Sequence, residues 1–327
     1  MREGIAHPSI PERRLRRINR RLALAPSPAK AEPAKRARRL AMDLMAIAFP
    51  FNDPVAVHIG PLGVRWYGLA YMAGLLLGWL YMRRLCAEAR LWGGASPVTP
   101  HQADDFLFWA TLGTVLGGRL GFFLMYEPSM LLHDPLRFFR IWEGGMAFHG
   151  GLLGVGAAIW IFARLNRIPV RSLMDLSAAA VPFGLFFGRL ANFINGEIYG
   201  RLSDVPWAVE FPARVLLAGD AAGPRHPVQL YEAALEGLVM FVLLRYFTHS
   251  RLALRAPGLV TGVFLAAYGV FRIFAEYFKE WDYGQFFTTA YFSEGVVYSL
   301  PMIALGVWFV ATARRGRVGS FAASGRA

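Results

Sequence analysis

The chain has 327 residues, of which 55% are hydrophobic and only 17% are charged, and its formal net charge is +13. Soluble domains carry about a quarter charged residues, so this composition, with a mean hydropathy of +0.37, excludes most soluble classes and indicates a membrane protein. The single cysteine, Cys86, excludes an intrachain disulfide and a cysteine-based metal cluster.

The basic charge is concentrated at the N-terminus, where residues 1–41 hold twelve Lys or Arg and three Glu, or +9 of the +13. This Pro-, Ala- and Arg-rich segment lacks apolar periodicity and the apolar core of a signal peptide, so we predict a disordered tail over 1–44. The other basic residues lie at the ends of apolar segments, as membrane topology requires. They do not form a nucleic-acid-binding face, and we predict no nucleic-acid partner.

Seven apolar stretches follow the tail, each near the roughly 20 residues that span a bilayer. They cover about 66–85, 105–126, 146–165, 173–195, 228–247, 258–278 and 294–313. A polar insertion over about 199–227 separates the fourth stretch from the fifth and predicts an extramembrane loop or small subdomain. The expected fold class is therefore all-α: a polytopic seven-helix membrane domain over 45–316, followed by a tail over 317–327.

Orientation follows from the loops, because every second loop carries three arginines. Examples are Arg83, Arg84 and Arg90 after the first stretch, and Arg314, Arg315 and Arg317 after the seventh. Arginine-rich loops face the cytoplasm, which places the C-terminus in the cytoplasm and the 199–227 insertion in the periplasm. The basic tail would then lie outside. Either it reflects an upstream start codon, with Met42 or Met45 the true first residue, or it is a translocated tail.

This topology brings polar residues of six stretches to one depth, in the outer half of the bilayer. A charge inside a span costs about 2.5–3.5 kcal/mol on insertion scales, so each one requires a partner or a function. The residues at this depth are Tyr67, Arg119, His149, Arg189, Asn192, Gln229, Tyr231, Glu232, Tyr268, Arg272 and Glu276. They predict a cavity open to the outer leaflet. The alternative is that individual side chains near helix ends reach the headgroups without a function.

Two local spacings support a shared site. Arg189, Asn192 and Gly196 stand at i, i+3 and i+7, so the arginine and the amide can contact the same ligand. Gly188 and Gly196 would allow close approach of a neighbouring helix or a lipid.

Tyr268, Arg272 and Glu276 step by four residues, which lets Glu276 hold Arg272 and offset part of its burial. The alternative is a paired arginine that only fixes packing. Two arginines at this depth suit a lipid phosphate, which a guanidinium group binds bidentately.

His149 is followed by two glycines, Gly150 and Gly151, which would leave room for a substrate beside the imidazole. Because imidazole changes charge near neutral pH, His149 is the candidate general base. The alternative is a structural histidine.

Residues 188–201 read GRLANFINGEIYGR and resemble the signature of the bacterial prolipoprotein diacylglyceryl transferases. Four further stretches resemble the same family in the same order, namely VRWYGLAY at 64–71, GGMAFHGGLLG at 144–154, HPVQLYE at 226–232 and YGVFRIFAEYF at 268–278. The resemblance covers about 48–312 and excludes the N-terminal tail.

The resemblance implies an inner-membrane enzyme that moves the diacylglyceryl group of phosphatidylglycerol to the lipobox cysteine thiol of a preprolipoprotein, with release of glycerol phosphate. Its partners would be phosphatidylglycerol, lipoprotein signal peptides and membrane lipids, and it would need no cofactor or metal. Arg189 and Arg272 match residues regarded as lipid-phosphate ligands, and His149 matches a residue regarded as essential. Tyr67, Asn192, Glu197 and Tyr268 match other functional positions of the family. Together with Arg189 and with Glu276, which the spacing on its helix adds, they are the predicted substrate-binding residues.

Two segments depart from the family pattern. Val296 stands where a glutamine is usual, and Lys279, Glu280, Trp281 and Asp282 replace the Arg-x-Pro-Asp that often follows the position of Glu276. Both departures lie at the outer rim, where they concern lid or acceptor contacts more than the phosphate site.

The residue chemistry suggests a displacement at the glycerol carbon that is bonded to phosphate. His149 would form the thiolate, and the two arginines would stabilise the leaving glycerol phosphate. The rival functions are a secondary transporter and a non-catalytic lipid-binding or assembly protein. Transporters place polar groups near the midplane between repeat halves, whereas this chain has no internal duplication and its polar groups are displaced outward.

The topology can be tested with reporter fusions. A reporter fused after Arg315 is expected to report the cytoplasm, and one fused near Gly219 the periplasm, because the arginine-rich loops stay inside. The opposite pair of results would reverse the depth assigned to every site residue.

Overall fold

The computed structural model describes residues 47–51, 53, 55–59, 62–129, 133–217, 219–280 and 293–314. The predicted tails over 1–44 and 317–327 lie outside these residues. The chain divides into two compact units, one formed by Met1–Phe49 with Leu202–Arg225 and the other by Pro50–Arg201 with His226–Ala327.

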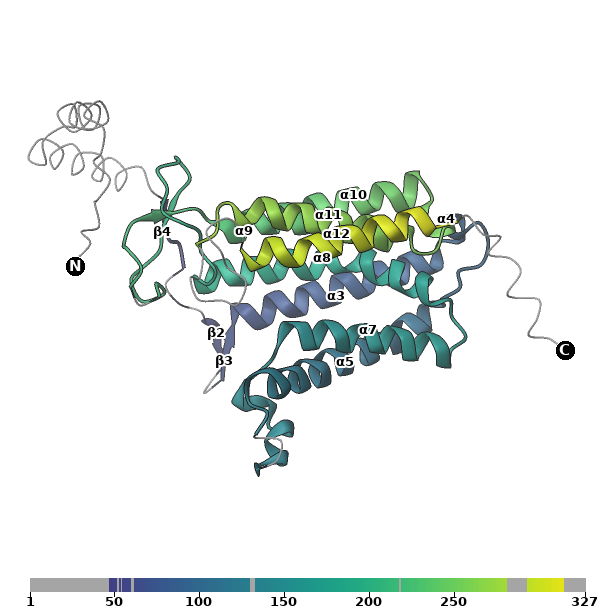
Figure 1. The fold of residues 1–327 in the computed structure, drawn as a ribbon, viewed down its shortest axis with the longest axis horizontal. Coiled ribbons are helices and arrows are strands. Elements are labelled where there is room, and N and C mark those ends of the chain that lie inside the picture. Colours follow the sequence, from purple (N-terminus) through teal and green to yellow (C-terminus); the bar gives the residue numbers. More distant parts are fainter. Residues whose placement is uncertain are drawn as a thin grey trace, which may run out of the picture. The chain divides into compact units, whose positions relative to one another are not determined.

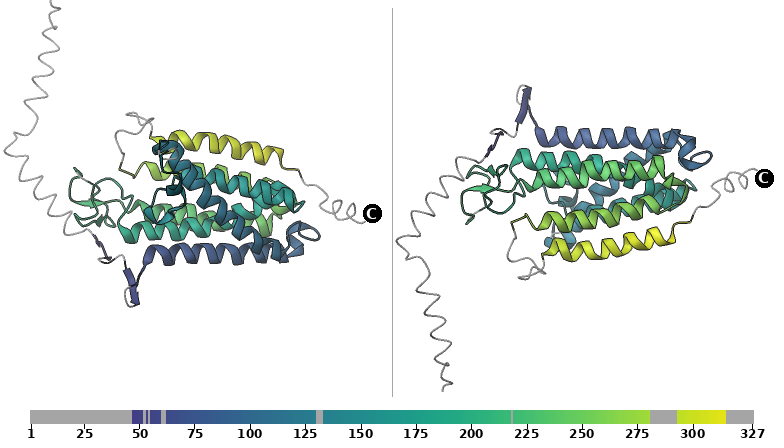
Figure 2. Two further views of the ribbon diagram at one scale, coloured as in Figure 1. Left: turned by 90° about the horizontal axis from the view of Figure 1, so that it is seen from below. Right: turned by 90° about the horizontal axis from the view of Figure 1, so that it is seen from above.

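The larger unit is a bundle of long helices that lie side by side (Figures 1 and 2). In chain order they are α3 (Trp66–Ala87), the short α4 (Ala89–Trp92), α5 (Pro100–Tyr126), α7 (Phe148–Leu165), α8 (Val170–Asn195), α11 (Leu259–Glu276) and α12 (Glu294–Thr312). Between α8 and α11, a helical run over 228–250 comprises α9 (Val228–Glu232), the π-helical η3 (Ala233–Val239), α10 (Met240–Arg245) and the π-helical η4 (Tyr246–Ser250). We refer to this run as the fifth helix.

Each of the seven predicted apolar ranges overlaps one of these long helices or the fifth helix, and the predicted and observed ends differ by up to several residues. Five of the helices are long and apolar enough to cross a membrane, namely α5, α7, α8, α11 and α12. Many of their large apolar side chains are exposed, for example Leu116 and Leu120 on α5 and Leu153 on α7. The chain is therefore a mostly helical, multi-pass membrane protein.

The all-α prediction missed several short strands. In the smaller unit, β1 (Ile47–Ala48), β4 (Val209–Glu210) and β5 (Pro224–Arg225) form a sheet in the order β1-β4-β5. In the larger unit, β2 (Val55–Ile59) and β3 (Leu62–Arg65) form an antiparallel hairpin before α3. β1, β4 and β5 have two residues each, too few to show an alternating apolar pattern in the sequence.

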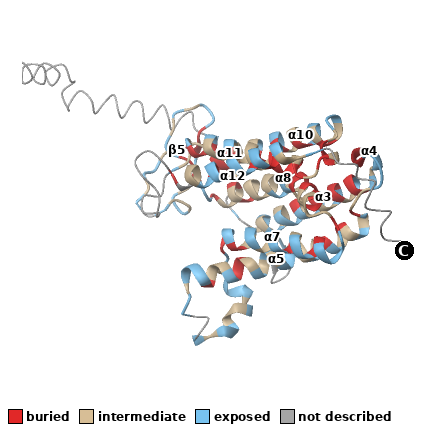
Figure 3. Cartoon of the chain, turned by 45° about the vertical axis from the view of Figure 1, so that its right-hand side comes forward, coloured by how far each residue is buried: buried red, intermediate tan, exposed pale blue. Residues whose placement is uncertain are grey.

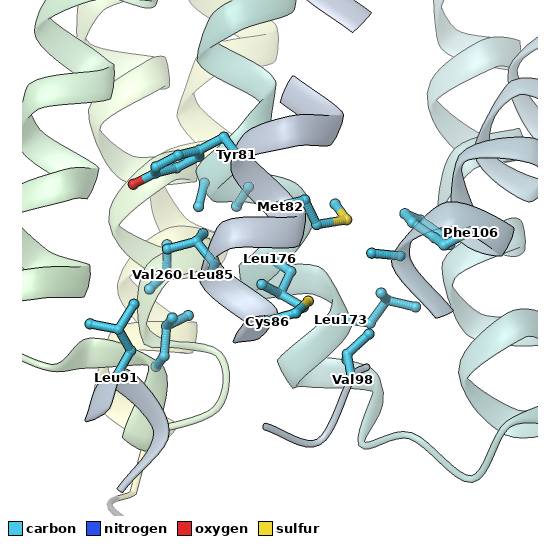
Figure 4. Close-up of a cluster of buried hydrophobic side chains, with 14 of the residues drawn as sticks. Tyr81, Met82, Leu85, Cys86, Leu91, Val98, Phe106, Leu173, Leu176 and Val260 are labelled. Carbon is cyan, nitrogen blue, oxygen red and sulfur yellow. The ribbon is translucent and has the colours of Figure 1, made fainter. Parts of the chain in front are cut away.

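Buried residues concentrate where α3, α4, α8, the fifth helix and α11 meet (Figure 3). The cluster includes Leu85, Leu91, Leu173, Leu176 and Val260, each at most 1% exposed. Figure 4 shows these side chains between the helices. This core lies near the α4 end of the bundle and fixes α3 and α8 against α11.

A buried carboxylate joins α8 to the start of α11. Asp175, which is fully buried, accepts hydrogen bonds from the backbone N–H groups of Gly258 and Thr261 at 2.7 and 2.8 Å. It also accepts one from the Thr261 hydroxyl at 2.7 Å. The first N–H groups of a helix have no partner within the helix, so Asp175 satisfies them from another helix and fixes the position of α11.

Glycines hold α5 and α7 in direct backbone contact. A Cβ atom added to Gly154 would lie 2.0 Å from the carbonyl oxygen of Gly113, and one added to Gly150 would lie 2.3 Å from that of Gly117. Small residues let membrane helices approach closely enough for van der Waals contact between backbones. The position of α7, and of His149 in its first turn, therefore depends on these glycines.

Gly154→Ala should destabilise the protein by about 1–3 kcal/mol, as overpacking does, because α5 and α7 would have to separate. Gly156→Ala is the matched control on the same helix, since its added Cβ would meet no atom within 4 Å. Thermal unfolding in detergent measures both variants. Equal midpoints would show that the glycine contact contributes nothing to stability.

Candidate functional site

The two predicted arginines contact the same buried carboxylate. Arg189 of α8 and Arg272 of α11 both form ion pairs with Glu232 of α9; Arg189 Nε lies 3.1 Å from Glu232 Oε2, and Arg272 Nη1 contacts Oε1. Glu232 is fully buried. One side chain of the fifth helix thus joins the guanidinium groups of two other helices.

Two further carboxylates complete the cluster. Arg189 Nη2 lies 3.2 Å from Oε2 of Glu236, which is fully buried on η3. Arg272 Nη2 lies 3.5 Å from Oε2 of Glu276, one helical turn further along α11, as the spacing predicts. We call these five residues the arginine–glutamate cluster. Because a buried guanidinium without a counter-charge is strongly destabilising, the carboxylates allow both arginines to remain charged.

Each arginine keeps part of its donor capacity. The Arg189 and Arg272 side chains are 17% and 19% exposed. Among the described residues, the ion pairs and hydrogen bonds of Arg189 use Nε and Nη2, and those of Arg272 use Nη1 and Nη2. Arg189 Nη1 and Arg272 Nε therefore have no partner in that part of the chain. An anionic ligand could accept one charge-assisted hydrogen bond from each of these nitrogen atoms and so bridge the two arginines.

Tyr268 lies beside this cluster on α11. It is close enough to Glu236, Arg189 and Arg272 to interact with them electrostatically, and its ring stacks on Phe264 at a centroid distance of 5.8 Å. The predicted stripe Tyr268–Arg272–Glu276 thus follows one side of α11 along the buried carboxylates.

A second polar group surrounds Glu197, in the loop after α8. Asn192 Nδ2 donates to Glu197 Oε2 at 2.9 Å, and Asn195 Nδ2 donates to Oε1 at 3.1 Å. Gln229, which is fully buried, donates to the backbone oxygen of Glu197 at 2.5 Å. Asn192 therefore contacts Glu197, and no hydrogen bond joins it to Arg189 in the described residues.

The backbone of this loop is constrained. Gly196 ends α8 with a φ of 72°, and Ile198 has a φ of 56°, which is rare for a β-branched residue. The loop then contacts the residues that follow α11. Gly200 forms an antiparallel β-bridge with Lys279, and the backbone N–H of Arg201 donates to Phe278 O at 3.0 Å. The ends of α8 and α11, which carry the two arginines, are thereby tied together.

Tyr67 opens α3, and its hydroxyl group lies 3.0 Å from that of Tyr71. The two rings lie 4.7 Å apart. Tyr67 is also within electrostatic range of Glu197. The structure therefore brings Tyr67 to the group around Glu197 rather than into direct contact with an arginine.

His149 is exposed at the start of α7, and its ring lies 5.4 Å from that of Tyr298 on α12. No hydrogen bond or ion pair reaches the imidazole from any described residue. The expectation that Gly150 leaves space for a substrate is wrong, because Gly150 packs against Gly117 and Gly121 of α5.

Gly188 was predicted to allow the close approach of a helix or a lipid, and of these the lipid stays a prediction. A Cβ atom added there would meet no atom within 4 Å, so no described helix packs closely against it. A close approach occurs instead at Gly295 of α12, where an added Cβ would lie 2.4 Å from Glu276 Oε2. The first turn of α12 therefore packs directly on a carboxylate of the cluster.

Arg119 was expected to line the cavity, and this expectation is wrong. It is 2% exposed and donates to backbone carbonyl oxygens of the α5–α7 connection, including Phe138 at 3.0 Å, Gly145 at 3.1 Å and Arg140 at 3.2 Å. It fixes this connection, which contains the 3₁₀ helices η1 (Pro135–Phe139) and η2 (Ile141–Glu143). Tyr231, another residue at the predicted depth, has its hydroxyl group 3.0 Å from Nδ1 of His226.

Sequence reasoning gave Glu232 no role beyond its depth and did not identify Glu236. The balance of charges within the apolar stretches could have identified both glutamates. Two carboxylates four residues apart in an apolar helix, facing two intramembrane arginines, are natural counter-charges.

The family model described as prolipoprotein diacylglyceryl transferase matches residues 54–312. A phosphatidylglycerol–prolipoprotein diacylglyceryl transferase of Rhizobium meliloti (strain 1021) is 54% identical over 279 residues, which are 84% of this chain and 97% of that protein. The protein of the same name from Rhodopseudomonas palustris is 47% identical over 279 residues, 84% of this chain and 95% of that protein.

Glu232→Gln should destabilise the protein by about 3–5 kcal/mol, the cost of removing one partner from a buried ion pair, because two guanidinium groups would lose their shared counter-charge. Glu143→Gln is the control, since Glu143 pairs with Arg137 and Arg140 in a more exposed position, with its side chain 37% exposed. Thermal unfolding in detergent compares them. A Glu232 variant as stable as the control would show that the bridge does not hold the helices together.

Proposed function

The chain belongs to the prolipoprotein diacylglyceryl transferase family, and from this premise we propose which of its residues carry out the transfer. The enzyme transfers the diacylglyceryl group of phosphatidylglycerol to a prolipoprotein, the first step of lipoprotein maturation. The acceptor atom in this proposal is the sulfur of the lipobox cysteine in the signal peptide.

In the proposed reaction the acceptor thiolate attacks the carbon of the diacylated glycerol unit that is bonded to the phosphate oxygen. A carbon–sulfur bond forms and the carbon–oxygen bond to phosphate breaks. The products are a thioether and glycerol phosphate, which takes the electron pair and gains negative charge. The reaction needs a base for the thiol proton and cations for the leaving group.

The observation that carries the proposal is the fixed pair of arginines on Glu232. Because carboxylates hold both guanidinium groups in place, little reorganisation is needed when charge develops on the leaving phosphate. Arg189 Nη1 and Arg272 Nε supply the donors. Arg189 and Arg272 are therefore proposed as catalytic residues that also bind the phosphate, and Glu276 as the residue that holds Arg272.

His149 is proposed as the base that removes the proton of the acceptor thiol. Two observations support it: the imidazole is exposed, and no described residue occupies its nitrogen atoms. Asn192 and Glu197 would position the headgroup from the loop after α8. Tyr67 and Tyr268 would donate hydrogen bonds to phosphate or glyceryl oxygens.

The topology belongs to the same proposal. We place α3 and the fifth helix in the membrane with the five helices named above, which makes seven spans in the inner membrane. The residues of the cluster then lie toward the outer leaflet, the insertion 199–227 in the periplasm and the C-terminus in the cytoplasm, as the arginine-rich loops indicate.

Arg189→Ala and Arg272→Ala should each lower turnover on the order of 10²–10³-fold, as removal of one donor to a transition-state anion does. Arg189→Lys should rescue poorly, because an ammonium group lacks the planar fork with which Arg189 contacts Glu232 and Glu236 and still keeps a donor for the ligand. The assay follows thioether product and glycerol phosphate from labelled phosphatidylglycerol and a lipobox peptide. Arg164→Ala, at an exposed arginine stacked on Trp160, is the control, and size-exclusion chromatography checks folding. Near-normal turnover of a folded Ala variant would remove that arginine from the site.

His149→Gln should slow transfer by about 10²–10⁴-fold while phosphatidylglycerol binding stays close to normal, because glutamine cannot accept the proton. Raising the pH from 7 to 9 should restore part of the rate, since a free thiol ionises near a pKa of about 8.5 and solvent can then supply the thiolate. A defect that is the same at both pH values, or a loss of lipid binding, would make His149 an orienting or packing residue.

A further inference from the structure

A cavity of about 650 Å³ lies in the helical unit, away from the arginine–glutamate cluster. It is bounded by the last turns of α3, by the segment that leads into α4, by α8 and by the last turns of the fifth helix. Arg84, at this cavity, and Tyr67 lie about 26 Å apart along α3 at 1.5 Å rise per residue. The cavity is therefore at the opposite end of the bundle from the proposed reaction site.

The lining changes from apolar to cationic along two helices. On α3, Leu77 and Leu80 precede Arg84, and on the fifth helix Phe241 precedes Arg245. Both helices run from the β3 end of the bundle to the α4 end (Figure 1). The apolar part of the cavity thus lies nearer the middle of the bundle, and the charged part lies at its end.

The charged part has an excess of cations. Three arginines, Arg84, Arg90 and Arg245, stand against one carboxylate, Glu88. Arg90 contacts Glu88 at 3.0 Å, whereas Arg84 forms no ion pair or hydrogen bond with any described residue. Arg245 Nη1 lies 3.1 Å from Nε2 of His249. An anionic group would therefore find two arginines that no carboxylate neutralises.

A buried hydroxyl group gives an independent indication of a ligand. Tyr81 lines the cavity and is 8% exposed, yet its hydroxyl group has no hydrogen-bond partner among the described residues. Thr248 and the Arg245 guanidinium group lie close enough to interact with the hydroxyl group, but neither makes a well-directed hydrogen bond to it. The Thr248 hydroxyl instead donates to Arg245 O or pairs with His249. Figure 4 shows the Tyr81 hydroxyl directed away from Met82 and Cys86. Buried hydroxyl groups normally have a partner, and a phosphate oxygen would supply one.

We propose that this cavity binds one anionic phospholipid of the leaflet at the α4 end of the bundle. The phosphate would lie among Arg84, Arg245 and Tyr81, and an acyl chain would follow Leu77, Leu80 and Phe241. A free phosphate ion would use only the charged part, whereas a phospholipid matches both parts, and basic pockets between membrane helices are typical sites for anionic headgroups. Under the topology proposed above, this is the cytoplasmic leaflet.

Native mass spectrometry of the full chain in detergent tests the proposal, with phosphatidic acid as the probe and phosphatidylcholine of the same chain length as the uncharged comparison. The wild type should retain one more molecule of phosphatidic acid per protein chain than of phosphatidylcholine. In Arg84→Gln/Arg245→Gln this additional lipid should bind at least about tenfold more weakly, which corresponds to about 1.4 kcal/mol. Tyr81→Phe, which removes one oxygen atom only, should weaken it by a smaller factor.

Arg164→Gln is the matched control, because Arg164 is an exposed arginine at the end of α7 and does not line the cavity. It should bind phosphatidic acid as the wild type does, and transfer activity of all the variants should stay near normal, which checks folding. Unchanged binding in both the double variant and the Tyr81 variant would overturn the proposal, as would an equal loss in the Arg164 control. Displacement of the lipid by inorganic phosphate would assign the site to a free anion instead. The cavity variants keep the proposed reaction site, so they should still bind phosphatidic acid there. A negative result for the cavity would therefore not contradict the proposed transfer reaction.

Discussion

Two guanidinium groups share one fully buried carboxylate, and the positions of three helices at the proposed reaction site depend on this arrangement. Glu232 links α8 to α11 through the fifth helix, and Glu236 and Glu276 add a counter-charge on either side. Charges in an apolar environment are tolerated only when they are paired. The same pairing that makes burial possible also fixes the positions of the cations, which is what stabilisation of a developing anion requires.

The rest of the bundle supports these positions through contacts that are specific to each helix pair. Asp175 holds the start of α11 against α8, far along both helices from the arginines. Gly200 and Arg201 tie the loop after α8 to the end of α11. Glycines bring α5 and α7 into backbone contact, and Arg119 organises the connection between them. Because the membrane provides little hydrophobic drive between helices, close packing and buried hydrogen bonds must supply the cohesion.

The two ends of the bundle have different chemistry. At one end, carboxylates pair with both arginines of the cluster and leave one nitrogen atom of each without a partner among the described residues. At the other end, Arg84 and Arg245 have no carboxylate partner among the described residues, and they line the charged part of a cavity that also contains the Tyr81 hydroxyl group.

The sequence by itself determined the class of protein and the positions of the long helices, because apolar length and loop arginines are local properties of the chain. It also predicted that Arg189 and Arg272 lie at one depth and that Glu276 follows Arg272 on the same side of α11, because helical spacing is local. Only the tertiary structure decided which carboxylate each arginine meets. Glu232 lies 40 residues before Arg272, and their contact depends on how three helices pack.

Packing decided the other differences as well. Arg119 shares the depth of the predicted site, but its donors are used by backbone carbonyl groups of the next connection. Gly150 follows the candidate base, yet it serves contact with α5. The short strands, and the close approach of Gly295 to Glu276, arise between segments far apart in the chain. Depth and spacing follow from the order of residues, whereas the partner of each side chain depends on which helix faces it.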